Sequence, residues 1–156
     1  MSPSPTLRER LVEELKAAMK AGDKPKVSAV RLIQAALKDK DIESRGAGRG
    51  QASDDEILGV MQKMVKQRQE SAAIYAANAR PDLAETENGE IAVISSFLPS
   101  QLSEAEVAAA IAEAVRETGA ASMKDMGRVV AALKARHAGQ MDFAKASALV
   151  KAALSG

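Results

Sequence analysis

One histidine and no cysteine restrict the chemistry that this 156-residue chain could perform. His137 is expected in the last turn of a helix, just before Gly139, where an imidazolium favourably faces the negative end of the helix dipole. No serine, aspartate or second histidine stands at a spacing that would complete a catalytic triad. Without cysteine, thiolate zinc sites and a cysteine nucleophile are excluded. We therefore do not expect the chain to be an enzyme on its own.

Two groups of carboxylates could in principle bind a hard metal ion or act as an acid and a base. The first group, residues 54–56, lies where a helix should begin, and there its negative charge complements the helix dipole. The second group is Glu85, Glu87 and Glu90, whose spacing is typical of a solvated helix face. We expect neither a metal site nor a cofactor.

Gly46, Gly48 and Gly50 superficially suggest a phosphate-binding loop. Such a loop needs a preceding strand and a Gly-Lys-Ser/Thr ending before a helix, whereas here the run ends in Gly50-Gln51. We interpret residues 45–52 as a mobile glycine-rich loop that cannot sustain a helix and that links two helices. Backbone contact with an RNA phosphate stays open as an alternative.

Basic residues gather near the end of the chain. Residues 99–121 carry four glutamates and one arginine, whereas residues 122–156 carry six cations and two aspartates. Cations that converge on one face bind phosphates and release counterions, although the same pattern also occurs on a solvated helix surface. Gly127 costs about 1 kcal/mol relative to alanine in a helix, which suggests close approach by a neighbouring helix or a ligand. The candidate phosphate-binding residues are Lys124, Gly127, Arg128, Lys134, Gly139, Lys145 and Lys151.

Helices must position these residues, because the composition favours helix formers and aromatic residues make up only 2% of the chain. No segment shows the alternation of apolar and polar residues that predicts a strand. The pairs Thr6–Glu9, Ser53–Glu56 and Ser103–Glu106 match capping boxes at helix starts. The fold class is therefore all-α, with four helices and then three, starting near residues 7, 24, 54, 81, 104, 123 and 143.

Leu98-Pro99 is the predicted domain boundary, because proline disfavours helix in the residue before it and lacks an N–H donor. We expect an N-terminal four-helix domain, residues 1–98, in which residues 1–5 form a loose arm. A C-terminal three-helix bundle, residues 99–156, should follow. No apolar run approaches the ~20 residues of a membrane span, and no signal peptide is evident. We expect a cytoplasmic protein.

An ordered set of short matches along nearly the whole chain resembles the GatB/YqeY family. In the last third the resemblance rests on residues 122–127, Val129, Gly139 and Val150-Lys151. Upstream matches are residues 19–20, Arg31, residues 35–38, residues 65–68, Ser71, Arg80, residues 82–83, Glu87, residues 90–91, residues 98–99 and residues 101–103. The glycine content of residues 45–51 and the Asn88-Gly89 pair depart from the family's pattern.

The resemblance implies a protein similar to the tail domain of the B subunit of the tRNA-dependent amidotransferase. That enzyme, a carbon–nitrogen ligase with glutamine as amido-N-donor, amidates glutamate or aspartate misacylated on tRNA. In it the tail touches tRNA, while phosphorylation and amide transfer occur elsewhere. The resemblance therefore implies a free-standing, non-catalytic binding module.

Two functions follow as hypotheses. The first is a tRNA-associated binding module that does not bind DNA and that uses the basic end of the chain. The second is an adaptor for an amidotransferase or an aminoacyl-tRNA synthetase subunit, with Lys66, Gln67, Arg68 and Ser71 as its interaction surface.

Overall fold

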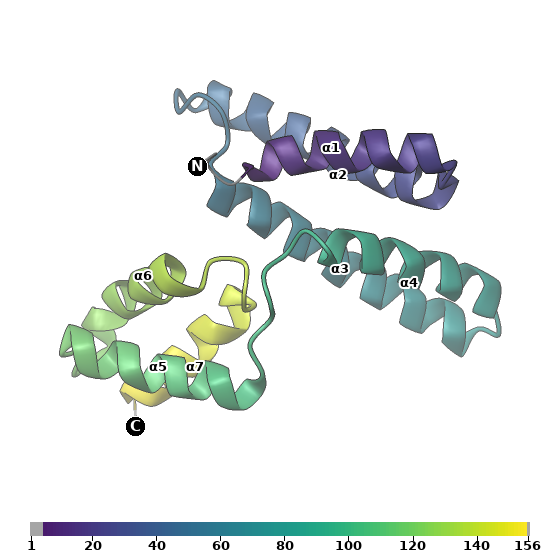
Figure 1. The fold of residues 1–156 in the computed structure, drawn as a ribbon. Coiled ribbons are helices and arrows are strands. Elements are labelled where there is room, and N and C mark those ends of the chain that lie inside the picture. Colours follow the sequence, from purple (N-terminus) through teal and green to yellow (C-terminus); the bar gives the residue numbers. More distant parts are fainter. Residues whose placement is uncertain (1–4, 156) are drawn as a thin grey trace. The chain divides into compact units, whose positions relative to one another are not determined.

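A computed structural model describes residues 5–155, and within that range it contains helices and no strand. The chain divides into two compact units, residues up to Leu98 and residues from Pro99 onward. The first unit contains α1 (Leu7–Ala21), α2 (Lys24–Gly46), α3 (Asp54–Ala77) and α4 (Pro81–Ser95). The second contains α5 (Glu104–Thr118), the 3₁₀ turn η1 (Met123–Asp125), α6 (Met126–His137) and α7 (Phe143–Ser155) (Figure 1).

Local capping chemistry sets where several helices begin and end. Thr6, Ser53 and Ser103 each accept a hydrogen bond from the backbone N–H three residues later, and the glutamate there bonds back to the cap. α1 and α5 end at Gly22 and Gly119, whose φ values of 69° and 67° are left-handed. Glycine adopts this conformation without the steric cost that a Cβ imposes.

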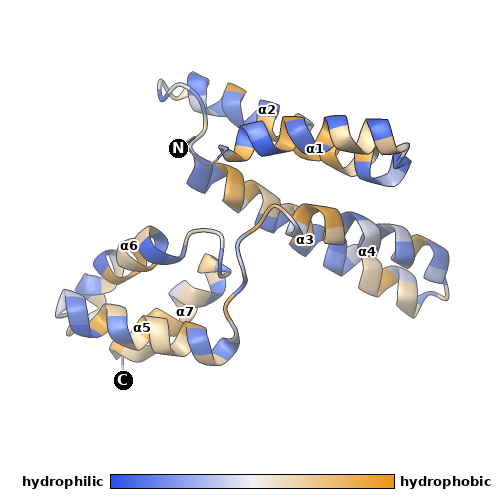
Figure 2. Cartoon of the chain, in the orientation of Figure 1, coloured by the Kyte–Doolittle hydropathy of each residue, from blue (hydrophilic) through white to orange (hydrophobic). Residues whose placement is uncertain are grey.

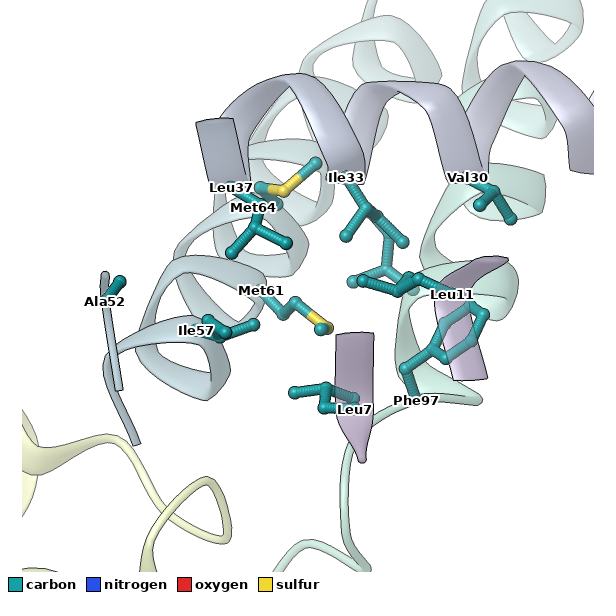
Figure 3. Close-up of a cluster of buried hydrophobic side chains, with 11 residues drawn as sticks. Leu7, Leu11, Val30, Ile33, Leu37, Ala52, Ile57, Met61, Met64 and Phe97 are labelled. Carbon is teal, nitrogen blue, oxygen red and sulfur yellow. The ribbon is translucent and has the colours of Figure 1, made fainter. Parts of the chain in front are cut away.

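The first unit consists of two helical hairpins, α1–α2 and α3–α4, and α2 also packs against α3 and α4 (Figure 1). Its core lies where these helices meet (Figure 3). Leu11, Ile33 and Met61, from three different helices, are at most 1% exposed. Burying each such side chain contributes roughly 1.5–3 kcal/mol relative to exposure. Phe97, which follows α4, closes the core and is 2% exposed.

The second unit packs each of its three α-helices against the other two. Its core includes Val129, Leu133 and Val150, together with three buried alanines, Ala110, Ala114 and Ala146. Small side chains let helix backbones approach closely. In Figure 2, α5 and α7 are pale or orange along much of their length, in keeping with these small and apolar residues.

The structure differs from the sequence expectations at several points. The predicted glycine-rich loop, residues 45–52, was wrong at its start, because α2 continues through Arg45 and Gly46. Residues 1–4 of the predicted loose arm lie outside the described residues. α4 runs through Gly89 without interruption, so the Asn88-Gly89 pair does not break it. Lys124 lies in η1, before α6 begins, and does not share one continuous α-helix with Arg128.

Candidate functional site

The predicted phosphate-binding residues lie in consecutive segments of the second unit. Lys124 is in η1, and Gly139 is in the connection between α6 and α7. α6 carries Gly127, Arg128 and Lys134, and α7 carries Lys145 and Lys151.

Arg128 has protein partners. Its guanidinium contacts the Asp125 carboxylate at 2.5 Å and donates to the Thr118 carbonyl at 3.3 Å, so it ties the start of α6 to the end of α5. The pKa of Asp125 is lowered, first by the Ala121 N–H and then by Arg128. The Arg128 side chain is nevertheless 61% exposed. A phosphate could therefore reach it, in competition with Asp125.

The four lysines are exposed. Lys134 lies over the ring of Phe143, with its Nζ 6.0 Å from the ring centroid, which links α6 to the start of α7. Lys124, Lys145 and Lys151 make no ion pair within residues 5–155. These three ammonium groups are thus available to an anionic ligand.

The cations of each helix spread over a broad face rather than a single line. At 3.6 residues per turn, Arg128 and Lys134 lie about 120° apart around α6. Lys145 and Lys151 are likewise separated by about 120° around α7. The remaining cation of α6, Arg136, contacts Glu117 of α5 and holds the two helices together.

The two candidate glycines have different surroundings. A Cβ at Gly127 would meet nothing within 4 Å, so no neighbouring helix among the described residues requires a glycine there. Gly139 is buried with a φ of 74°, and its carbonyl accepts a hydrogen bond from Gln101 Nε2 at 2.6 Å. The backbone conformation alone therefore accounts for Gly139.

The predicted interaction surface on α3 includes exposed residues and one arginine that is paired within the first unit. Lys66 and Gln67 are exposed, and Ser71 is half-buried. Arg68 donates from Nε to Glu90 of α4 at 2.7 Å and from Nη1 to the Met64 carbonyl at 3.1 Å. Its charge is compensated inside the first unit, so Arg68 joins α3 to α4.

A polar cluster that sequence reasoning did not find ties three segments of the first unit together. Arg8 of α1 donates two hydrogen bonds to the Asp41 carboxylate of α2, at 2.7 and 2.9 Å, and a third to the Ala52 carbonyl at 3.0 Å. The Ala52 N–H donates to Asp41 at 2.9 Å. The hydrogen bonds from Arg8 and then Ala52 hold the pKa of Asp41 well below its ordinary value.

One sequence signal could have revealed this cluster. Val30, Ile33 and Leu37 form the buried face of α2, and at the same three-to-four spacing the next residues are Asp41 and Ser44, which are also buried. A carboxylate on an apolar face requires a partner, since burying an unpaired charge is costly. The partner, Arg8, is 33 residues away and cannot be read from the sequence.

His137 and the carboxylates were the candidates for catalysis or metal binding. His137 ends α6 as expected, and its Nδ1 lies 3.1 Å from Gln140 Oε1. Within the same range, no group of three or more His, Cys, Asp or Glu residues is placed to hold a metal ion. Nor does any helix in that part of the chain combine the length and apolar character needed to cross a membrane. Cations open to solvent are therefore the chemical feature that the second unit presents.

Comparisons with known proteins bear on the family and on location. Yeast relatives named "Altered inheritance of mitochondria protein 41, mitochondrial" include one from Saccharomyces cerevisiae, 33% identical over 98 residues, 62% of this chain and 51% of the relative. A Vanderwaltozyma polyspora protein is 31% identical over 90 residues, 58% of this chain and 47% of the relative. A Candida glabrata protein is 33% identical over 88 residues, 56% of this chain and 47% of the relative. The chain thus spans about half the length of these relatives.

These relatives contradict the expected cytoplasmic location, since their names describe mitochondrial proteins. The expectation was wrong because it rested on the lack of an export signal. Such a lack does not distinguish the cytoplasm from an organelle.

The match to a family extends over almost the whole chain. The model of the family described as "Yqey-like protein" matches residues 8–154, which include both units and all seven α-helices almost from end to end. The chain therefore belongs to the YqeY-like protein family.

Proposed function

We propose that this protein is a non-catalytic, tRNA-associated binding module whose second unit acts as a three-helix tail domain. The observation that supports this proposal most directly is the exposure of Lys124, Lys145 and Lys151 without an ion pair within residues 5–155. Phosphates neutralise such cations and release counterions, which favours association with a polyanion.

The scarcity of aromatic residues in the second unit favours a folded RNA over a single strand. Proteins that bind single strands stack bases on aromatic side chains. The second unit has one aromatic residue, Phe143, which is half-buried beneath Lys134. Recognition through phosphates and duplex shape is therefore the mode we propose, as for a folded tRNA.

The family resemblance supplies the choice of tRNA among folded RNAs. The module would act beside an amidotransferase, a carbon–nitrogen ligase with glutamine as amido-N-donor, without performing the amide transfer itself. Because the curated relatives are about twice as long as the matched segment, their own activities are not carried over to this chain.

Filter binding of total tRNA at low salt tests the proposal. We expect Lys145→Glu/Lys151→Glu to lower the affinity, on the order of tenfold or more, because two phosphate contacts become repulsive. Both side chains are exposed, and a glutamate in the first turn of α7 is compatible with the helix dipole. The variant should therefore fold.

Lys16→Glu/Lys63→Glu is the matched control, because it makes the same change in net charge at two exposed positions of the first unit. Equal affinities of wild type and the second-unit variant would contradict the proposal. So would an equal loss in the control, since it would show only a general charge effect.

A second candidate function is an adaptor for an amidotransferase or aminoacyl-tRNA synthetase subunit. It is favoured by Ile74, which is 61% exposed and lies on the same face of α3 as Gln67 and Ser71. A partner held through this face would stay bound after nuclease treatment and at high salt, whereas an RNA-mediated contact would be lost. Loss of the partner under those conditions would reject the adaptor.

A further inference from the structure

A row of cations runs along the outer face of α2, in the unit that the proposed tRNA site does not involve. Lys24, Arg31, Lys38 and Arg45 follow one another at intervals of seven residues, so each lies about 20° around the helix from the one before and all four fall within a band of about 60°. All four are exposed. Consecutive cations are about 10.5 Å apart along the axis, and the row extends over about 32 Å at a rise of 1.5 Å per residue.

The residues that alternate with these cations on the same face of α2 are uncharged. Ser28, Ala35 and Ile42 alternate with the cations on the same stripe and are exposed as well. We call these seven residues of α2, at positions 24, 28, 31, 35, 38, 42 and 45, the α2 stripe. It contains four cations and no carboxylate, and two of its three uncharged side chains are small.

The stripe cations are not used to hold the first unit together. Within residues 5–155, Lys24, Arg31 and Lys38 form no ion pair, and Arg45 acts on Asp41 only through its charge. By contrast, the other two lysines of α2 are engaged: Lys26 binds Glu14 of α1 at 2.8 Å, and Lys40 lies 3.4 Å from Glu43.

Two of the three aspartates near the stripe are engaged in other contacts. Asp23 caps α2 by accepting from the Lys26 N–H. Asp41 is buried against Arg8. Asp39 is exposed and lies about 100° around the helix from Lys38 but about 40° from Ala35, so it borders the stripe as a single carboxylate beside four cations. The face thus presents a net positive charge.

We propose that the α2 stripe binds the phosphate backbone of double-helical RNA. A rigid helix holds its charges at fixed spacings in a gently turning row, and a duplex is the form of nucleic acid whose phosphates are also fixed along a stiff surface. The stripe has no aromatic residue on which single-stranded bases could stack. A lipid surface would require a continuous face of bulky apolar side chains, whereas the stripe offers only Ile42.

This inference deepens the proposed function, on which it rests for the choice of RNA, and gives the protein a second surface for the same class of ligand. Nothing in it requires a particular placement of the two units. Each surface has its own cations, so each can be removed separately.

The test uses the full chain and an RNA duplex of roughly 16 base pairs, the length that a compact duplex-binding domain covers. Affinity is measured over a series of salt concentrations for wild type, Lys38→Gln and Arg31→Gln/Lys38→Gln. We expect the slope of log affinity against log salt to shrink by about one for each cation removed. The double variant should also bind on the order of tenfold more weakly at low salt.

Lys40→Gln is the matched control. It makes the same substitution on the same helix, two residues from Lys38 and on a different face, and its partner Glu43 has a side chain 67% exposed. An unchanged slope is expected. Thermal unfolding of the stripe variants should match that of the wild type, because the stripe residues are exposed and unpaired, and Lys40→Gln should differ little, because its pair with Glu43 is largely exposed. A slope that falls equally for Lys40→Gln and Lys38→Gln would overturn the proposal.

Lys145→Glu/Lys151→Glu, measured against the same duplex, separates this inference from the proposed function. If that variant loses affinity and the stripe variants bind as wild type does, the stripe proposal is overturned and the second-unit site stands. If only the stripe variants lose affinity, the stripe proposal is supported and the second-unit site is contradicted. Polyglutamate that competes as well as the duplex would instead identify the stripe as a site for acidic protein segments and overturn it as an RNA site.

Discussion

The two units use their charged residues differently. In the first unit, Arg8–Asp41 and Arg68–Glu90 join helices through side chains that are at most 28% exposed. In the second unit, the ion pairs of Arg128 and Arg136 are formed by side chains that are 61% and 43% exposed. Exposed pairs contribute little to stability, whereas partly buried pairs leave a costly charge behind when one partner is removed.

The hydrophobic cores of the two units also differ, in the size of their buried side chains. The first core consists mainly of leucine, isoleucine and methionine side chains from α1 to α4 together with Phe97, whereas the second contains three buried alanines. Small side chains bury less apolar surface, so the second unit has less hydrophobic stabilisation to lose. The comparison teaches that partly buried ion pairs join helices in the first unit, whereas the ion pairs described for the second unit are more exposed and contribute less to its stability.

The largest expected effect comes from truncating one core leucine in each unit. Leu11 and Leu133 are each 1% exposed, and a leucine-to-alanine change in a core costs about 2–5 kcal/mol. We expect Leu133→Ala to abolish protection of the amide hydrogens of α5–α7, because a smaller unit has less stability to spare. Leu11→Ala should leave the first unit folded but weakened. Hydrogen exchange followed by NMR measures the amide protection of each unit in the two variants. An equal loss of protection in the mutated unit of both variants would contradict the proposed difference in stability between the units.

The next largest expected effect is on the melting temperature, when a carboxylate paired with an arginine is replaced by an amide. Asp41→Asn removes the charge that pairs with Arg8 and replaces the oxygen that accepts from Arg8 Nη1 by a donor, so the contact among α1, α2 and the segment before α3 is weakened. Asp82→Asn is the control, because Asp82 also faces an arginine, Arg80, but with a side chain 65% exposed. We expect a clear fall in the melting temperature for Asp41→Asn and almost none for Asp82→Asn. A similar melting temperature for both variants would refute the structural role of Asp41.

Lowering the pH should reproduce part of the destabilisation expected for Asp41→Asn. The pKa of Asp41 is lowered in the folded protein, so the stabilisation from its charge is fully present above its unfolded pKa of about 3.9. It is lost as the pH falls below that value towards the lower folded pKa. We expect the first unit of Asp41→Asn to lose less stability between pH 5 and pH 2 than that of the wild type. Identical acid profiles, measured by urea unfolding, would contradict this assignment.

The smallest effects come from two glycines of the second unit. Gly139→Ala places a Cβ on a residue with a φ of 74°, which costs roughly 1–2 kcal/mol. Gly127→Ala should instead stabilise α6 by about 0.5–1 kcal/mol, because its Cβ meets nothing within 4 Å. Urea unfolding measures both changes. Destabilisation by Gly127→Ala would show that the packing around α6 differs from that described.

Features that depend on neighbouring residues were predictable from the sequence. The capping boxes at Thr6, Ser53 and Ser103 are present at the starts of α1, α3 and α5, because their hydrogen bonds join residues three apart. The end of α2 was mispredicted, since glycine lowers helix propensity without forbidding a helix, and Gly46 occupies its last turn.

The candidate site was predictable in composition but not in detail. Charge alone identified Arg128 and Lys145 as candidates, yet only the folded chain distinguishes the paired arginine from the exposed lysine without an ion pair. Arg68 was assigned to a surface because Glu90, its partner at 2.7 Å, lies 22 residues away on another helix. The row on α2 was visible in the sequence as a spacing of seven, but its exposure and freedom from ion pairs required the structure.

The claim that solvent-exposed cations of this protein bind tRNA is tested most directly by the salt dependence of wild-type binding. Total tRNA is titrated with the full chain at salt concentrations from about 50 to 200 mM, the range over which phosphate contacts weaken strongly. We predict a linear fall of log affinity against log salt, with a slope that indicates several phosphates neutralised. Affinity that does not change with salt, or no binding at the lowest salt, would contradict the account.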